Sequence, residues 1–180
     1  MTACHVAVAF SHMAKSASGP SRKRVPKRRP DVQAYLEAVE GSRGPNAYVA
    51  LLGMEAADTA SLHDRVEQGI PYRYLEKLHS LMDVQRSALT DALMVSERTI
   101  HRRKEAGRLQ PDESDRVLRL TRLFGKAIEL FEGDDRQAVA WFRKPIRGLG
   151  DRSPLEMSRT GPGALEVERL IDRLEHGVPS

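Results

Sequence analysis

The hydrophobic residues of this chain recur every three or four positions over most of its length, which is the spacing of helices that bury one face. The first such pattern begins at Asp31 and ends before a break rich in glycine and proline at residues 41–45. A short apolar run at residues 48–54 fits either a strand or a helix. Strand signals are otherwise nearly absent, so we predict an all-α fold of about six to eight helices.

The later helices are marked by proline and acidic residues where helices usually begin. Pro71 occupies a permitted first-turn position of one helix. Pro111 and the carboxylates after it open a long amphipathic helix, which we expect to be central. A shorter helix spans residues 134–142 with Trp141 as a core anchor, and the last spans residues 163–176.

Residues 89–104 carry the most specific local pattern, two short helices joined by a tight turn. Ser96 is a natural N-cap because its side chain can accept a hydrogen bond from the backbone of Thr99, and Gly107 suits the end of the helix. Ile100 falls on the inner face of this second helix. Six polar side chains are then predicted to face outward: Arg98, Thr99, His101, Arg102, Arg103 and Lys104.

A capped cationic helix after a short helix and a turn is typical of a helix-turn-helix, whose second helix lies in the major groove of DNA. Arginine is the side chain best shaped for guanine edges and for phosphate oxygens. The alternative interpretation is a solvated basic helix face that binds no ligand. The pattern favours nucleic acid as the first partner to consider.

The positive charge of the chain is concentrated near its N-terminus. Residues 1–46 contain eight Lys or Arg and three Asp or Glu, a balance of +5, and the whole chain carries +4, which leaves −1 for the rest. Basic character in the helical part must therefore be local, as on a single groove-reading helix.

Residues 1–30 lack periodicity, and we predict that they form a disordered basic tail. Its basic cluster at residues 22–29 could lie along phosphates as a flexible arm, or serve only as a solubilising tail. Met13 is a plausible translation start, in which case residues 1–12 would not be translated.

The sequence gives little support to an enzyme. It contains no glycine-rich phosphate loop, no zinc-protease motif and no nucleophile elbow, and its six histidines lack metal-ligand spacing. A single cysteine, Cys4, permits no intramolecular disulfide and fits a reducing compartment. No apolar run approaches the ~20 residues that span a bilayer. We therefore expect a cytoplasmic protein with no membrane partner, no metal and no cofactor.

Three blocks in the second half of the chain form a signature when they are taken together. They are residues 95–104 (VSERTIHRRK), residues 109–120 (LQPDESDRVLRL), and residues 150–157 (GDRSPLEM) followed by 163–177 (GALEVERLIDRLEHG). In this order and spacing they resemble the Xre/MbcA/ParS antitoxin family, whose members are paired with RES-domain toxins. The resemblance runs from about Pro71 to the end of the chain. With the tail at 1–30, it implies an Xre-like helix-turn-helix domain at 31–125 and a toxin-binding domain at 126–180.

The resemblance implies a non-enzymatic protein with two binding functions. The helix-turn-helix would bind operator DNA and repress a toxin–antitoxin operon, through the six outward-facing residues named above. The C-terminal region would cover the active site of a NAD-consuming toxin. The residues implied for that contact are Arg152, Ser153, Pro154, Arg173, Glu175 and His176.

We also expect a homodimer, because two-fold operator sites pair with two-fold proteins. Two alternatives stay open: a stand-alone helix-turn-helix regulator without a toxin partner, and an interaction protein that has lost DNA binding.

In the loop at residues 150–154, the arginine could enter an anion-binding pocket of the toxin, or Asp151 and Arg152 could merely cap a helical turn.

Two residues depart from the usual helix-turn-helix pattern. Thr90 stands where such proteins usually carry alanine, and Met94 stands where the turn usually has glycine. A positive φ is costly for methionine. We therefore expect either a remodelled turn or weakened DNA binding.

Overall fold

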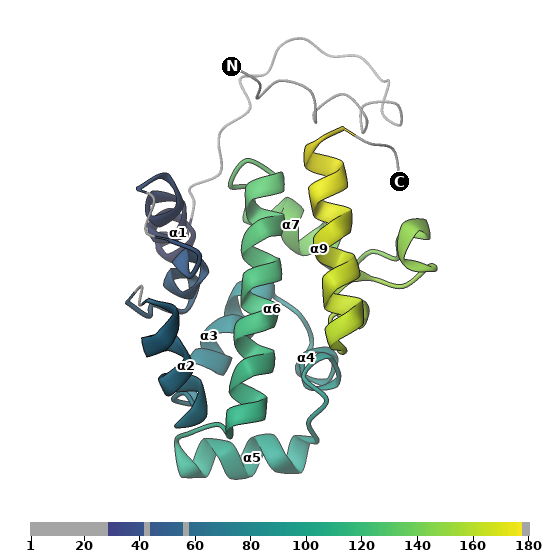
Figure 1. The fold of residues 1–180 in the computed structure, drawn as a ribbon. Coiled ribbons are helices and arrows are strands. Elements are labelled where there is room, and N and C mark those ends of the chain that lie inside the picture. Colours follow the sequence, from purple (N-terminus) through teal and green to yellow (C-terminus); the bar gives the residue numbers. More distant parts are fainter. Residues whose placement is uncertain (1–28, 42–43, 56–57, 178–180) are drawn as a thin grey trace.

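The computed structural model describes residues 29–41, 44–55 and 58–177, which form a bundle of helices around one long helix (Figure 1). Within these ranges there is no strand, only two isolated bridges, Pro71–Arg108 and Ile146–Arg152. The all-α prediction is confirmed. The elements are α1 (Pro30–Glu40), the 3₁₀ helix η3 (Ala47–Leu52), α2 (Thr59–Glu67), α3 (Arg73–Met82), α4 (Arg86–Ala92), α5 (Glu97–Ala106), α6 (Pro111–Leu130), α7 (Asp135–Arg143), the 3₁₀ helix η4 (Arg147–Leu149), α8 (Pro154–Met157) and α9 (Gly161–Glu175).

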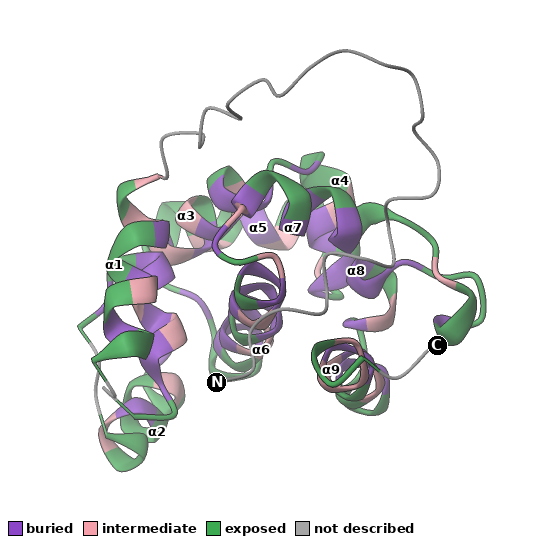
Figure 2. Cartoon of the chain, turned by 90° about the horizontal axis from the view of Figure 1, so that it is seen from above, coloured by how far each residue is buried: buried purple, intermediate pink, exposed green. Residues whose placement is uncertain are grey.

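Helix α6 is central, as the sequence predicts. Pro111 occupies its first turn, and the backbone N–H of Gln110 donates to Glu113 Oε2 at 2.9 Å, which satisfies one of the free donors at the helix start. Helix α6 packs against η3, α2, α3, α7 and α9. In the view from above, it lies between α1 and α2 on one side and α9 on the other (Figure 2).

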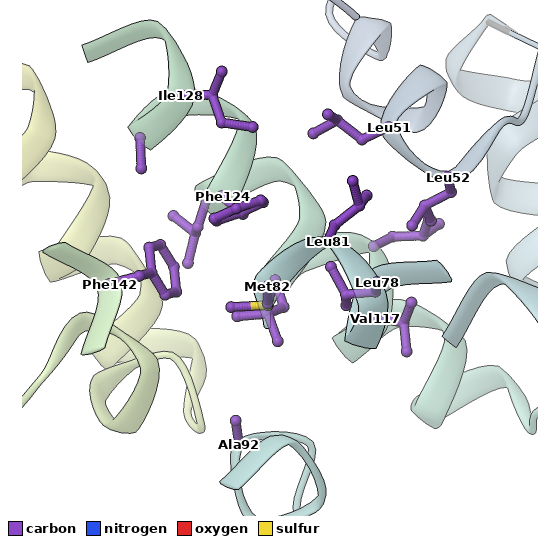
Figure 3. Close-up of a cluster of buried hydrophobic side chains, with 14 of the residues drawn as sticks. Leu51, Leu52, Leu78, Leu81, Met82, Ala92, Val117, Phe124, Ile128 and Phe142 are labelled. Atoms are coloured by element: carbon purple, nitrogen blue, oxygen red, sulfur yellow. The ribbon is translucent and has the colours of Figure 1, made fainter. Parts of the chain in front are cut away.

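The core is built from side chains that these helices turn toward α6. Phe124 of α6 meets Phe142 of α7 edge to face, with ring centroids 5.8 Å apart. Leu78 and Met82 of α3 lie near them from a third side (Figure 3). Trp141 is 8% exposed, so its prediction as a core anchor is confirmed.

Helix α1 is attached to α6 through a close approach at Gly125. A Cβ atom at this position would lie 2.8 Å from the hydroxyl of Tyr35, closer than real Cβ contacts allow. The Tyr35 hydroxyl donates to a carboxylate oxygen of Glu129. At the start of α1, Arg29 pairs with Asp135 of α7 at 2.9 Å. The start and the middle of α1 are thus fastened to the C-terminal half of the chain.

Some predicted boundaries differ from the structure. The ambiguous run at residues 48–54 is the 3₁₀ helix η3, and α2 was not predicted because Leu62 is its only buried residue. Pro71 precedes α3 and pairs with Arg108 instead of lying in the first turn. Arg29 caps α1 and Pro30 begins it, so the predicted tail ends at residue 28 at the latest; residues 1–28 lie outside the described residues.

The predicted domain boundary at residue 125 falls inside α6, which continues without a break from Pro111 to Leu130. The division into domains at 31–125 and 126–180 stays a prediction. None of the helices in the described ranges combines the length and the apolar character needed to cross a bilayer.

Candidate functional site

Helices α4 and α5 form the predicted helix-turn-helix. Ser96 Oγ accepts a hydrogen bond from the backbone N–H of Thr99 at 3.1 Å, as the sequence predicts. Gly107 ends α5 with φ +69°, a left-handed conformation that glycine adopts without strain. Ile100 is 4% exposed and turns toward the interior. On α4 and just after it, the buried residues are Leu89, Thr90, Ala92 and Leu93.

The turn between the two helices has Met94 in the left-handed conformation, with φ +53°. The backbone N–H of Met94 donates to Asp91 O and that of Val95 donates to Thr90 O, both at 3.0 Å. The turn is therefore not remodelled, and methionine carries the strain that a glycine would avoid. Its side chain is 56% exposed. The buried Thr90 hydroxyl is satisfied because it donates to Ser87 O at 2.8 Å.

Most of the predicted DNA-facing residues lie on the solvent side of α5. Arg98, His101, Arg102 and Lys104 are exposed, and Thr99 is half-buried. Within the described part of the chain, Arg98 and Arg102 form no ion pair or hydrogen bond. His101 Nδ1 lies 3.5 Å from Glu105, and Lys104 Nζ lies 3.5 Å from Glu76 of α3.

The outward orientation predicted for Arg103 is wrong. Its Nε donates to both carboxylate oxygens of Glu113 on α6, at 3.0 and 2.8 Å, and the two side chains are only 14% and 8% exposed. This hydrogen bond raises the pKa of Arg103 above its usual value. The sequence showed Glu113 only as a helix-start carboxylate, because nothing local indicates that it reaches back to α5.

The C-terminal end of α5 is tied to the segment before α3. Tyr72 N–H donates to Gly107 O at 2.9 Å, and Leu109 N–H donates to Ile70 O at 2.9 Å, on either side of the Pro71–Arg108 bridge. Arg103 and this short pairing hold α5 from two directions. The exposed face of α5 therefore sits on a rigid support.

A second candidate surface is the short loop between α7 and α8. Ile146 N–H donates to Arg152 O and Asp151 N–H donates to Ile146 O, both at 3.1 Å. Gly150 and Asp151 both have positive φ, +66° and +59°, so the loop turns sharply. Arg152 is exposed at its end. The structure thus presents Arg152 on a projecting turn before α8.

Ser153 and Pro154, the next two predicted contacts, are buried. The Ser153 side chain accepts from the backbone of Glu156 at 3.2 Å, and the Ser153 backbone N–H donates to Glu156 Oε2 at 2.7 Å, a reciprocal capping box. The backbone N–H of Ser153, and then its hydroxyl, donate to Glu156 Oε2 and lower the pKa of Glu156 below its usual value. In this structure both residues shape the start of α8 instead of facing solvent.

The remaining three predicted contacts lie at the far end of α9. Arg173 donates to Glu166 at 3.2 Å, and the ring nitrogen Nδ1 of His176 lies 2.6 Å from the carbonyl oxygen of Asp172. Glu175 has its pKa raised by burial first and then by the negative charges of Glu129 and Asp172. The six predicted toxin contacts therefore form two groups, one at the start of α8 and one at the end of α9.

No group of three or more His, Cys, Asp or Glu side chains in the ranges that the structure describes is placed to hold a metal ion. What the two surfaces offer is exposed charge on rigid elements, which suits binding.

Comparison with known protein families places each of the two surfaces in a known domain family. Residues 61–122 match the antitoxin Xre-like helix-turn-helix domain, and residues 126–177 match the antitoxin Xre/MbcA/ParS C-terminal toxin-binding domain. Together the two matches contain both candidate surfaces.

Three relatives are similar over most of their length. "Antitoxin Xre" of Yersinia enterocolitica is 37% identical over 128 residues, which cover 71% of this chain and 86% of the relative. "Antitoxin Xre" of Photorhabdus laumondii is 32% identical over 130 residues, covering 72% and 88%. The "Prs ADP-ribosylating antitoxin" of a Sphingobium species is 26% identical over 145 residues, covering 74% and 88%.

Proposed function

The chain belongs to the Xre/MbcA/ParS antitoxin family, and on that premise we propose that it neutralises a RES-domain toxin and represses the operon that encodes both proteins. It is the antitoxin of a toxin–antitoxin system, with a helix-turn-helix domain and a toxin-binding domain. The proposed action is binding without catalysis, in the cytoplasm.

The observation that carries the DNA-binding role is the solvent face of α5. Arg98 and Arg102 are exposed on one side of a helix whose other side is held by Ile100 and by the Arg103–Glu113 pair. Arginine can donate two parallel hydrogen bonds to a guanine edge. We assign base or phosphate contacts to Arg98, His101 and Arg102, with Thr99 and Lys104 at the flanks, and we leave Arg103 out because Glu113 holds it.

The proposed toxin contact uses Arg152 and the end of α9. Arg152 stands on a sharp turn fixed by the Ile146–Arg152 bridge, so its guanidinium can enter a pocket that binds the phosphates of NAD. Arg173, Glu175 and His176 form the second contact. The name of the Sphingobium relative joins an antitoxin to ADP-ribosylation, a reaction that consumes NAD, which supports a NAD-consuming partner.

The match of residues 126–177 to a toxin-binding domain favours the antitoxin over a stand-alone regulator. We also propose that the protein is a homodimer, because a two-fold protein would match a two-fold operator.

Co-expression with the toxin encoded in the same operon tests the proposal. We expect the wild-type chain to restore growth of a toxin-expressing host and to repress a reporter driven by the operon promoter.

Two variants separate the functions. Arg98→Ala with Arg102→Ala should lose repression and still rescue growth, whereas Arg152→Ala should repress and rescue poorly. A wild-type chain that leaves the growth arrest unchanged would refute the antitoxin role for that toxin.

A further inference from the structure

A cavity of about 180 Å³ lies beside the C-terminal end of α5, outside the helix-turn-helix itself. It is bounded by the end of α2, the start of α3 and the residue that follows Gly107. Eight residues line it, among them Arg65, Gln68, Gly69, Pro71, Tyr74 and Arg108. Two of the eight are arginines and none carries a carboxylate, so the cavity favours an anion.

From this lining we propose that the cavity is a phosphate-binding site that takes an oxygen of the DNA backbone next to the groove read by α5. The inference rests on the DNA-binding role proposed above and adds a contact outside α5. The shared chemistry is a phosphate oxyanion, whether it belongs to a DNA strand or to a free ion.

The two arginines of the cavity differ in the hydrogen bonds that they form. Arg108 donates from one terminal nitrogen to the carbonyl oxygens of Gln68 and Gly69, at 3.0 and 2.8 Å. These bonds fix its guanidinium and leave its other N–H groups for a ligand, since arginine has five. Arg65, in the last turn of α2, is exposed and has no ion pair or hydrogen bond in the ranges described.

Two backbone segments beside the cavity are closely packed. Gly69 has φ +76°, and a Cβ atom there would collide with the carbonyl oxygen of Leu109. The chain before α3 therefore lies directly against the chain after α5. A third cation, Arg73, stacks on the lining residue Tyr74, with its guanidinium carbon 5.0 Å from the ring centroid.

The position of the cavity fits a backbone contact better than a base contact. The Pro71–Arg108 bridge joins it to the end of α5, and Figure 1 shows α2 toward the same end of the molecule as α5. A helix in the major groove is flanked by phosphates on both sides, and these phosphates are commonly held by arginines from neighbouring elements.

The test uses the full chain, operator DNA and an unrelated duplex, with binding measured between ~50 and ~200 mM salt. Arg65→Ala should weaken binding to both duplexes by the same factor, about three- to tenfold, and lower the slope of log K against log salt by ~0.9, the value for one phosphate contact. The matched control is Arg136→Ala, an exposed arginine on α7 at the opposite end of α6, which should change neither quantity.

An unchanged affinity and slope in Arg65→Ala would overturn the phosphate site while leaving the DNA-binding role intact. A loss confined to the operator would also overturn it, because it would indicate base recognition. Failure of the wild-type chain to bind operator DNA would instead refute the proposed repressor role.

A second measurement identifies the source of the phosphate. Inorganic phosphate is titrated at constant ionic strength while the amide NMR signals of Gln68 and Gly69 are followed. Saturable shifts at millimolar phosphate, absent in Arg65→Ala, would support a site for a free anion. Shifts that appear only with DNA would support the backbone contact.

Discussion

Arg103 of α5 and Glu113 of α6 form a two-bond ion pair that faces the interior, although Arg103 sits in the cationic run of α5. Glu113 also accepts from the backbone N–H of Gln110 at 2.9 Å. One carboxylate thus caps α6 and holds the preceding helix. The pair fixes the orientation of α5, and that orientation decides which cations face solvent.

Replacing Arg103 by alanine should destabilise the protein by about 2 kcal/mol, because it leaves a buried carboxylate without its charged partner. Urea denaturation measures the change. Arg102→Ala is the matched control on the same helix and should change the unfolding free energy by less than ~0.5 kcal/mol, since its side chain is exposed. Equal stability of the two variants would contradict the structural role of the pair.

Met94 and Gly107 both have positive φ, and each follows a short helix. Adding a glycine at one position and removing it at the other should therefore have opposite effects on stability. Met94→Gly should raise the unfolding free energy by roughly 0.5–1 kcal/mol, because relief of the left-handed strain exceeds the added flexibility of the unfolded chain. Gly107→Ala should lower it by about 1 kcal/mol through strain alone, as its added Cβ meets nothing within 4 Å. Thermal unfolding measures both, and a less stable Met94→Gly would show that the exposed methionine side chain contributes more than its strain.

The local features of the helix-turn-helix could be predicted from the sequence. The Ser96 cap, the inward Ile100 and the stop at Gly107 depend on residues within one helical segment. The orientation of Arg103 could not, because it depends on Glu113, ten residues away on another helix. Helix α2 escaped prediction for a related reason: Leu62 is its one buried residue, and the elements that cover Leu62 cannot be read from the local sequence pattern.

In the C-terminal candidate site, too, the sequence predicted some features and not others. The motif around residues 150–157 located the projecting turn, but it did not distinguish Arg152, which is exposed, from Ser153 and Pro154, which are buried in the start of α8. A serine followed three residues later by glutamate is a capping-box signature, and Glu156 was the available signal. The resemblance of the motif to the family therefore locates the region, whereas the capping-box pattern indicates which of its residues are buried in the helix start.

Glu175 should make the stability depend on pH. Its pKa is raised in the folded state by burial and by the nearby carboxylates. The folded state therefore favours the protonated form, and this stabilisation is present below the ordinary glutamate pKa and is lost as pH rises through the raised value. Glu175→Gln should consequently unfold at a higher urea concentration than wild type at pH 7, and at nearly the same concentration near pH 3.5, below the ordinary pKa of ~4.3.

The matched control for this pH dependence is Glu55→Gln, because Glu55 is exposed outside the helices. This variant also removes one negative charge, from an exposed position outside α9, and so controls for the change in net charge. A Glu175→Gln variant that is less stable than wild type at neutral pH would contradict the unfavourable charge environment at the end of α9.

Neighbouring residues Arg152 and Ser153 should separate binding from folding in the C-terminal region. Ser153→Ala removes the hydroxyl that accepts from the Glu156 backbone and should lower the unfolding free energy by about 1 kcal/mol, the usual value of an N-cap. Arg152→Ala removes an exposed side chain whose backbone forms the bridge to Ile146, so stability should stay within ~0.5 kcal/mol while affinity for the purified toxin falls. Calorimetric titration with the toxin and urea denaturation of the free protein measure the two quantities. If Arg152→Ala binds the toxin as wild type does, the turn before α8 is not the contact, and the proposed interface must be sought at the end of α9.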